Sequence, residues 1–517
     1  MPKALATPSC RIDRRAFLAA AAAAALGTSC KTTNKSAVKP GRTPNIVVIL
    51  ADDFGVGDIG ALNMGCKVPT PYLDTFVHQS MSFTDAHSAS AVCSPTRYGL
   101  LTGRYAWRTC LQEWVLDVYE PPLIAKDRLT LPKMLKQHGY ATACIGKWHL
   151  GLIWTGEGEV REKKVEFTVP IQEGPTTRGF DYYFGTEVPN FPPFTFIEND
   201  RVVVQPTDKM GPNDKSIHVG FRDAPMAPGW KFEEIMPTLT EKCVGYIHEH
   251  AKSNEPFFLY FPMTSPHEPV SPSEQFKGKS GIAPIADFLM ETDWSAGQVL
   301  KAIDDAGIAD NTIVIFAGDN GHSPYTGMEL LTEHGHTASG PYRGHKGQIW
   351  EGGHRVPLLV RWPKKIAAGS TSNQLVCLND VMATCAVALG HELPANAAED
   401  SFNMVPALRG NDKKTIRENL VNHDVKGRFA LRQGPWKLVT IADKETAPKY
   451  ELYNLDQDIA ESRDLSAQHP DIAAQMIAAL DTIVADGRST PGVKQLNDTD
   501  EIDVRHLPKQ RWARPRA

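Results

Sequence analysis

The sequence predicts an α/β fold: a large, mostly parallel β-sheet sandwiched between helices, with a small C-terminal α+β subdomain built on an antiparallel sheet. Short apolar runs, often β-branched, recur along the chain, and each is typical of a fully buried strand of a parallel sheet. These runs are residues 45–50, 141–145, 257–261, 311–316 and 357–362. Helical patterns lie between them, and strands that alternate with helices favour a parallel sheet covered by helices.

Two of the intervening helices are predicted from apolar spacing. Between residues 239 and 247, apolar side chains recur at i, i+4, i+7 and i+8, which places them on one helix face. Residues 288–303 carry a second apolar stripe, and Gly307 is expected to end that helix. Residues 155–235 break this alternation because they are rich in Pro, Gly, Phe and charge. We expect that segment to cap one edge of the functional site.

The C-terminal part of the chain has a different pattern. Residues 428–441 and 449–455 are predicted to be strands of an antiparallel hairpin, and residues 469–486 a helix with Pro470 near its start. We therefore divide the chain into a main domain, residues 44–414, and a C-terminal subdomain, residues 415–517.

Composition and charge narrow the class of protein. The 517-residue chain has 42% hydrophobic and 22% charged residues, which is ordinary for a soluble globular protein and excludes wholesale disorder. Its 55 Lys and Arg residues stand against 60 Asp and Glu residues, so the formal net charge is −5. Because there is no excess of positive charge, we expect no nucleic-acid partner.

Residues 1–30 are predicted to be a twin-arginine export signal. The pair Arg14-Arg15 precedes an apolar stretch, residues 17–26, that is too short to span a bilayer as a helix. Residues 31–43 are polar and lack periodicity, as a flexible tether should. The protein is therefore expected in the periplasm or outside the cell. It is either free or anchored by a lipid at Cys30, which would be its only membrane contact.

Acidic residues follow two of the predicted strands at their carboxyl ends. Asp52 and Asp53 come directly after the first strand, and Asp319 and Asn320 follow the strand at 311–316. In open α/β sheets ligands bind beyond the carboxyl ends of the strands. Three carboxylates and an amide oxygen would attract a hard divalent cation, either Ca²⁺ or Mg²⁺. Each pair taken alone is also a good turn sequence.

A cysteine is predicted at the start of a helix. In the segment Cys93-Ser94-Pro95, Ser94 suits the N-cap and Pro95 the first helical position. A helix N-terminus favours an anion, and Arg97 adds a fixed cation one turn on. A lone cysteine in this place would be either a thiol of lowered pKa or a buried structural residue.

These residues belong to a longer pattern. The segment CSPTR at 93–97, followed by LLTGR at 100–104, resembles the signature of the type I sulfatases, the formylglycine-dependent arylsulfatase family of the alkaline phosphatase superfamily. That family usually has Ser or Ala where this chain has Thr96. The resemblance covers nearly all of the chain after the leader. Its further motifs are ADDFG (51–55), GKWHLG (146–151), GFDYYFG (179–185), SPHEP (265–269), FAGDNG (316–321) and YRGHKGQIWEGGHRVP (342–357).

The resemblance implies an alkaline phosphatase-like fold and a role for each matched residue. A maturation enzyme would convert Cys93 to Cα-formylglycine, and Arg97 would steady the modified side chain. Four residues that surround the sulfate would complete the catalytic set: Lys147, His149, His267 and Lys346. The implied ligands of the Ca²⁺ or Mg²⁺ ion are Asp52, Asp53, Asp319, Asn320 and the formylglycine oxygen at Cys93.

The family mechanism is nucleophilic catalysis by the hydrated aldehyde. One hydroxyl would attack sulfur while the metal and Asp319 favour its oxyanion. Lys346 or His267 would protonate the departing alcohol. His149 would then take the proton of the second hydroxyl, which expels sulfate and restores the aldehyde.

The expected substrate is a sulfated small molecule or glycan, and a sulfated sugar is favoured. Aromatic residues at 191, 194 and 196 either rim the pocket or belong to the core. The histidines near the motifs are candidate substrate contacts, namely His322, His334, His336 and His345. Two other functions stay open: a phosphodiesterase or phosphonate monoester hydrolase of the same superfamily, and a non-catalytic binder of sulfated glycans.

Overall fold

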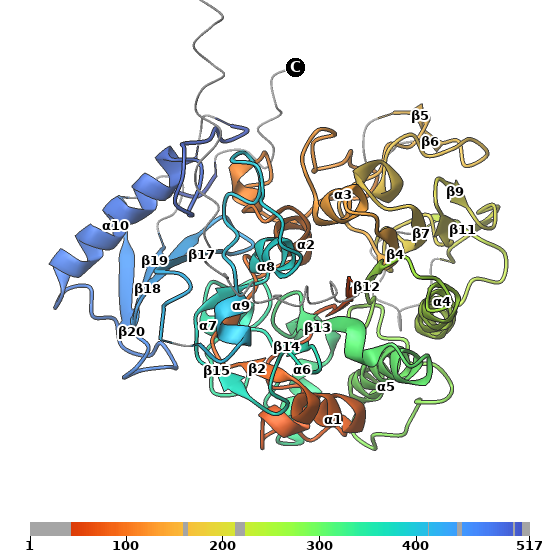
Figure 1. The fold of residues 1–517 in the computed structure, drawn as a ribbon, viewed down its shortest axis with the longest axis horizontal. Helices are drawn as coiled ribbons and strands as arrows, with labels where there is room; N and C mark the ends of the chain where they lie inside the picture. Colours follow the sequence, from red (N-terminus) through yellow and green to blue (C-terminus); the bar gives the residue numbers. More distant parts are fainter. Residues whose placement is uncertain are drawn as a thin grey trace, which may run out of the picture. The chain divides into compact units, whose positions relative to one another are not determined.

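A ten-stranded sheet with the order β15-β2-β14-β13-β1-β12-β4-β7-β8-β9 forms the centre of the fold (Figure 1). The computed structural model describes residues 43–158, 164–211, 223–411, 413–441, 447–499 and 502–508. The predicted export signal and all but the last residue of the tether lie outside these ranges. The strands of the sheet are β1 (Asn45–Ala51), β2 (Met81–Phe83), β4 (Ala141–Lys147), β7 (Tyr182–Thr186), β8 (Ile197–Glu198), β9 (Arg201–Val202), β12 (Phe257–Pro262), β13 (Thr312–Gly318), β14 (Leu358–Arg361) and β15 (Thr371–Ser372).

The five middle strands, β13, β1, β12, β4 and β7, are all parallel. The predicted α/β class with a mostly parallel sheet is therefore confirmed. The fifth apolar run of the sequence forms β14, which is antiparallel to β13 and to β2. All four residues of β14 are buried. The first three residues of β14 are apolar and buried, and such a run does not reveal the direction of its strand.

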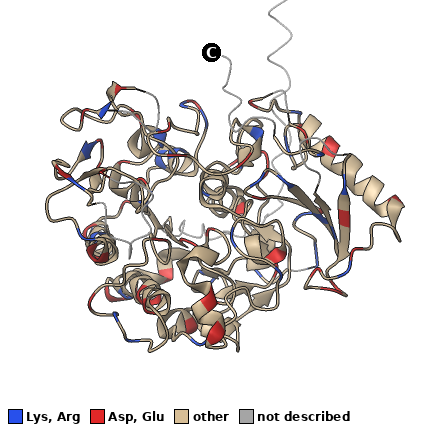
Figure 2. Ribbon diagram, turned by 180° about the vertical axis from the view of Figure 1, so that it is seen from behind, with Lys and Arg blue, Asp and Glu red and all other residues tan. Residues whose placement is uncertain are grey.

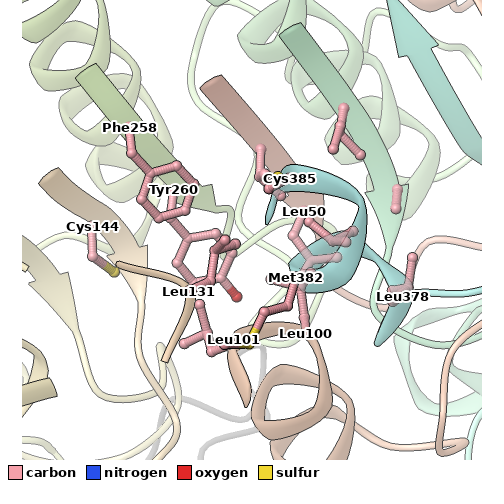
Figure 3. Packing of buried hydrophobic residues seen from close by; sticks show 14 of the residues in the cluster. Leu50, Leu100, Leu101, Leu131, Cys144, Phe258, Tyr260, Leu378, Met382 and Cys385 are labelled. Atoms are coloured by element: carbon pink, nitrogen blue, oxygen red, sulfur yellow. The ribbon is translucent and has the colours of Figure 1, made fainter. Parts of the chain in front are cut away.

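Helices cover both faces of the sheet, as predicted. On β1, Ile46, Val48 and Leu50 face one cluster of buried residues, which includes Leu101 and Met382 (Figure 3). The helices of that face are α2 (Cys93–Thr102), α3 (Leu131–Gln137) and α8 (Asp380–Ala388). The alternate β1 residues face a second cluster, whose helices are α1 (Pro71–Gln79), α4 (Ile235–His250) and α5 (Pro284–Asp305). The period of two along β1 thus supplies both cores.

The two predicted helices are α4 and α5, and Gly307 lies two residues past α5 with a φ of +67°. The segment 155–235 was expected to cap one edge of the site. It also adds strands β7, β8 and β9 to the edge of the central sheet, which the sequence did not predict. Very short strands carry too few residues to show a period in the sequence.

A four-stranded antiparallel sheet and one helix form the C-terminal part, as the fold prediction stated. Its elements are β17 (Asn419–His423), β18 (Phe429–Gln433), β19 (Trp436–Thr440), β20 (Tyr450–Asn454) and α10 (Pro470–Ala485). The prediction treated 428–441 as one strand, but a turn at Gly434, with φ +54°, divides it into β18 and β19. Leu431, Leu438, Met476 and Leu480 form a core between this sheet and α10.

The remaining strands and α-helices are short. They are β3 (Ala86–His87), β5 (Gly156–Glu157), β6 (Lys164–Val165), β10 (Asp208–Lys209), β11 (Pro225–Met226), β16 (Val376–Cys377), α6 (Met328–Glu333), α7 (Glu351–His354) and α9 (Val405–Leu408). Basic and acidic residues are interspersed over the helices and loops (Figure 2). Among the described residues, no helix is both long and apolar enough to cross a membrane.

Candidate active site

The carboxylates predicted at two strand ends meet because β1 and β13 are neighbours in parallel register. Asp52 and Asp53 follow β1, and Asp319 and Asn320 follow β13. All four are buried. The Asp53 amide donates to Asp319 Oδ1 at 3.0 Å, and Asn320 Nδ2 donates to Asp53 Oδ1 at 2.8 Å. The residue Asp53 has φ +63°, so its backbone is strained at the point where the carboxylates converge.

Cys93 is the first residue of α2 and lies beside this group. Its Sγ is 3.5 Å from Asp52 Oδ1. The N-cap is Val92 rather than the predicted Ser94, because the Ser94 hydroxyl instead accepts a hydrogen bond from the Leu116 amide at 3.2 Å. Burial and the nearby Asp319 raise the pKa of the Cys93 thiol. The alternative of a thiol with lowered pKa is therefore wrong for the unmodified residue.

Arg97 lies one turn along α2 and ties the acidic residues together. Its Nη2 is 2.7 Å from Asp319 Oδ2 and 3.4 Å from Asp52 Oδ1, and its Nη1 donates to the Lys147 carbonyl at 3.1 Å. The side chain is fully buried. Burial alone would lower the pKa of Arg97, but Asp319 and Asp52 raise it. The guanidinium is thus a permanent buried cation, in the place where the resemblance expected a supporting residue.

Two lysines approach the carboxylates from different elements. Lys147 ends β4, and its Nζ is 2.7 Å from Asp52 Oδ2. Lys346 comes from the loop before α7, and its Nζ is 2.7 Å from Asp53. Burial would lower the pKa of Lys346, yet the Asp53 carboxylate raises it. Three cations therefore surround three carboxylates.

Two histidines complete the group, and their hydrogen bonds fix their tautomers. His149 Nε2 lies 3.0 Å from the Leu116 carbonyl, so Nε2 carries the proton and Nδ1 the lone pair. That Nδ1 is buried and has no hydrogen-bond partner. His267 Nδ1 donates to the Glu268 carbonyl, which leaves its Nε2 3.9 Å from Asp53 Oδ2. Burial and Lys147 hold the pKa of both rings well below its usual range, so both are neutral.

The donor set fits a hard cation. Ligand atoms of Asp52, Asp53, Cys93 and His267 all lie within 4.8 Å of one another. The Asn320 Oδ1 is buried and accepts no hydrogen bond, although such atoms are almost always satisfied. An ion bound by the neighbouring carboxylates would use this oxygen. The carboxylate oxygens of Asp52 and Asp53 and the Asn320 Oδ1 are ligands of the kind that Ca²⁺ or Mg²⁺ prefers, whereas the unmodified Cys93 thiol and the His267 ring are not oxygen donors.

The other candidate histidines are placed differently. Asp58 Oδ1 accepts from His336 Nε2 at 2.7 Å, and Asp58 Oδ2 accepts from His322 Nδ1 at 2.9 Å. Because His336 Nδ1 also accepts from a backbone amide, that ring is fully used in internal bonds. The side chain of His334 bonds the Leu330 carbonyl on exposed α6. The side chain of His345 bonds the Lys346 carbonyl.

Of the three aromatic residues, Phe191 lies at the site and the other two belong to the core. The Phe191 ring meets the His149 ring edge to face at 5.8 Å, whereas Phe194 and Phe196 pack among buried aromatic residues. Sequence reasoning missed Glu187, whose Oε1 accepts from the Gly151 amide at 3.0 Å and whose carbonyl accepts from the His149 amide. Only its place just after a motif, two residues past GFDYYFG, marked it in the sequence.

Comparison with known proteins identifies the fold family. Residues 44–391 match the family model described as Sulfatase, and residues 344–486 match the model described as N-sulphoglucosamine sulphohydrolase, C-terminal. A protein named N-acetylgalactosamine-6-O-sulfatase, from Bacteroides thetaiotaomicron, is 31% identical over 509 residues, covering 89% of this chain and 97% of its own. Human arylsulfatase A is 31% identical over 408 residues, covering 77% and 74%.

Solved structures agree with this fold. One, described with the metabolism of multiple glycosaminoglycans by Bacteroides thetaiotaomicron, has a TM-score of 0.74 and 30% identity, covering 86% of this chain and 99% of that one. The phosphonate monoester hydrolase of Agrobacterium radiobacter has a TM-score of 0.57 at 17% identity, covering 86% and 96%. The second likeness concerns the fold alone.

Proposed function

Because this chain belongs to the sulfatase family and is a sulfatase, we propose that it hydrolyses sulfate monoesters on sulfated carbohydrates, with a formylglycine made from Cys93 and a divalent metal ion. The observation that carries the proposal is the convergence of three cations and two neutral histidines on one carboxylate cluster beside Cys93. The relative named N-acetylgalactosamine-6-O-sulfatase supports a sugar as the substrate.

A divalent metal ion and the formylglycine would add chemical groups that the unmodified side chains do not have. Asp52, Asp53, Asp319 and Asn320 would hold Ca²⁺, or Mg²⁺ in its place, together with the oxygen introduced at Cys93. The ion supplies positive charge next to the sulfate ester. The hydrated aldehyde, made by a maturation enzyme, supplies a hydroxyl nucleophile and a second hydroxyl that allows sulfate to leave.

The cations of the chain bind and orient the sulfate. Lys147 and Lys346 balance Asp52 and Asp53 in the protein alone, and Arg97 balances Asp319. A divalent ion would leave the group with an excess of two positive charges. Such an excess favours an anionic substrate and stabilises charge that develops on the transferring group.

The tautomers assign the proton transfers. Since His149 Nε2–H is held by the Leu116 carbonyl, its free Nδ1 is the base that accepts a proton at the nucleophile. The protonated ammonium of Lys346 can donate to the departing alcohol oxygen. His267 Nε2 carries a lone pair in this state, so His267 serves better as an acceptor that orients the leaving group. We therefore favour Lys346 over His267 as the acid.

The test keeps one leaving group, 4-nitrophenolate, and compares transfer of a sulfuryl group with transfer of a phosphoryl group. Purified enzyme from a host with the maturation enzyme is given 4-nitrophenyl sulfate, 4-nitrophenyl phosphate and a sulfated sugar. We expect kcat/KM for the sulfate esters to exceed that for the phosphate ester. Turnover of the phosphate far above that of the sulfate would instead support the phosphodiesterase or phosphonate hydrolase. Binding of sulfated sugar without any turnover would support the non-catalytic binder.

Export is part of the proposal because the leader predicts it. We propose that residues 1–30 direct the chain to the periplasm or the exterior, with Cys30 as the site of a lipid anchor. Replacing Arg14 and Arg15 together by Lys should leave the protein in the cytoplasm. Labelling with a fatty-acid probe, with Cys30→Ser as its control, tests the anchor. Normal export of the double variant would refute the twin-arginine route.

A further inference from the structure

The site opens to solvent on the side of Lys346. The Lys346 side chain is 15% exposed and that of His267 8%, whereas Lys147 and Asp52 are fully buried. A substrate must therefore enter past Lys346 and the chain that surrounds it. Whatever lies exposed around this opening is placed to contact the part of the substrate beyond the sulfate.

The loop at residues 112–116 is fixed beside this opening through backbone hydrogen bonds. The Trp114 amide donates to the Val425 carbonyl at 2.7 Å, and the Val425 amide donates to the carbonyl of Gly347, which directly follows Lys346, at 3.3 Å. At the other end of the loop, the Leu116 carbonyl holds His149 Nε2. Trp114 thus lies between a segment that presents Lys346 and one that positions His149.

The Trp114 side chain is unusually exposed. It is 49% exposed, and the other described tryptophans are buried or half-buried. Its φ is +64°, a left-handed conformation that bulky residues rarely adopt and that clusters at functional sites. Glycine, which has no Cβ, would adopt this backbone conformation without strain. An exposed indole is therefore carried by a loop whose backbone is hydrogen-bonded, through Val425, to the segment that presents Lys346.

We propose that Trp114 is a specificity-determining residue whose indole packs on the sugar ring that carries the sulfate ester. This rests on the proposed function, and it names the substrate class as pyranosides rather than simple alkyl sulfates. A sugar ring presents a face of C–H bonds, which packs on a rigid aromatic plane, while its hydroxyls stay solvated. The cations bind the sulfate, and Trp114 recognises the apolar face of its carrier.

The experiment measures binding of the sugar separately from binding of sulfate. Steady-state kinetics on N-acetylgalactosamine 6-sulfate are compared for wild type, Trp114→Ala and Trp114→Phe, together with inhibition by inorganic sulfate. The control is Val203→Ala, because Val203 is also 49% exposed but follows edge strand β9. We expect Trp114→Ala to raise KM about tenfold with a much smaller change in kcat, and Trp114→Phe to lose less. The inhibition constant of inorganic sulfate should stay at its wild-type value in both Trp114 variants, and the control Val203→Ala should keep the wild-type KM.

Several outcomes would overturn the proposal. These are an unchanged KM in Trp114→Ala, a sulfate inhibition constant that shifts in proportion to KM, and a wild-type dimer that Trp114→Ala converts to monomers without a change in KM. If the wild type cleaves 4-nitrophenyl sulfate but no sulfated sugar, the role of Trp114 is refuted while the sulfatase reaction stands. If mature enzyme cleaves no sulfate ester at all, the proposed function itself fails.

Discussion

Two buried polar clusters in this molecule contain the same kinds of residues but differ in what they leave unsatisfied. The active-site cluster lies at the carboxyl ends of β1 and β13. The second cluster joins α7 to the C-terminal sheet. There Lys437 on β19 lies 3.0 Å from Glu351 Oε1 and 2.7 Å from Glu461 Oε1, and His87 Nδ1 is 3.0 Å from His354 Nδ1. Both clusters hold lysine, carboxylate and histidine.

The two clusters differ in their buried polar atoms without a hydrogen-bond partner and in their exposure to solvent. In the second cluster, every polar side-chain atom of His87, Glu351, His354 and Lys437 has a hydrogen-bond partner, and these four residues are at most 1% exposed. The Glu461 Oε1 has no hydrogen bond, but it lies 2.7 Å from the Lys437 ammonium and forms an ion pair with it. The active-site cluster leaves Asn320 Oδ1 and His149 Nδ1 without a partner, and Lys346 reaches solvent. Residue types alone therefore do not distinguish a site for a ligand from a structural junction. Unsatisfied buried atoms next to an opening do.

The largest expected effect is a difference in activity between variants of Lys147, in the active-site cluster, and Lys437, in the second cluster. Lys147→Ala removes a cation that binds the sulfate, so kcat/KM should fall by about 10²–10³-fold. The fold should be retained in the metal-loaded enzyme, because the bound ion still pairs the buried Asp52. Lys437→Met should keep kcat within a few-fold at temperatures below its unfolding. Kinetics and circular dichroism on the same preparations check both. Equal activity losses in the two variants would remove the distinction between the clusters.

In stability the order of the two variants should be reversed, with the larger loss in Lys437→Met. Lys437→Met leaves Glu351 and Glu461 buried without their cation, so the free energy of unfolding should fall by about 3–5 kcal/mol. The matched control is Lys426→Met, because Lys426 is an exposed lysine in the β17–β18 turn of the same four-stranded sheet. Urea unfolding measures both. A loss of stability below that of the control would show that the second cluster is not a structural junction.

Metal removal should affect one cluster only. Treatment with EDTA is expected to abolish sulfate release and to lower stability by about 2.7 kcal/mol relative to enzyme in metal at a hundredfold excess over Kd. Asn320→Ala should reduce the difference in stability between metal-loaded and EDTA-treated enzyme, whereas Glu351→Gln should leave that difference unchanged. Selective loss with EGTA identifies Ca²⁺ rather than Mg²⁺. Activity that survives EDTA with no metal found by elemental analysis would contradict the assigned ligands.

The last prediction concerns the pH dependence of stability and a buried carboxyl, Glu187, that accepts a hydrogen bond from the Gly151 amide. Burial raises the pKa of Glu187 to about 8, so the folded state prefers it protonated. The stability this provides is fully present below the usual pKa of Glu and is lost as pH rises towards 8, by up to about 1.4 kcal/mol per pH unit. Glu187→Gln mimics the protonated acid and should flatten this loss. Thermal unfolding from pH 5 to 8 measures it, and parallel curves for variant and wild type would refute it.

The sequence predicted the centre of the fold well because its signals are local. The runs that form β1, β4, β12 and β13 are buried on both faces, and the stripe of α5 keeps one helical face apolar. The direction of β14 and the two-residue strands β8 and β9 were not predictable. They depend on pairing with distant strands, which no local pattern encodes.

The sequence allowed us to predict which residues form the site, but not how they are arranged. Asp52 and Asp319 were linked because each follows a strand, and Lys147, His149, His267 and Lys346 only through the resemblance. The N-cap at Ser94 failed because the hydroxyl is used by Leu116, 22 residues away in sequence. The tautomer of His149 and the support from Glu187 depend on contacts between separate loops, which only the structure supplies.

The central claim is that Cys93 is the precursor of the nucleophile. Mass spectrometry of the peptide that contains Cys93, taken from enzyme of measured specific activity, tests it most directly. We predict a peptide lighter by about 18 Da than the cysteine form, from exchange of the thiol for an aldehyde, in a fraction that rises with activity. Cys93→Ala should be inactive. Full activity with an unmodified Cys93 thiol, or in Cys93→Ala, would contradict the account.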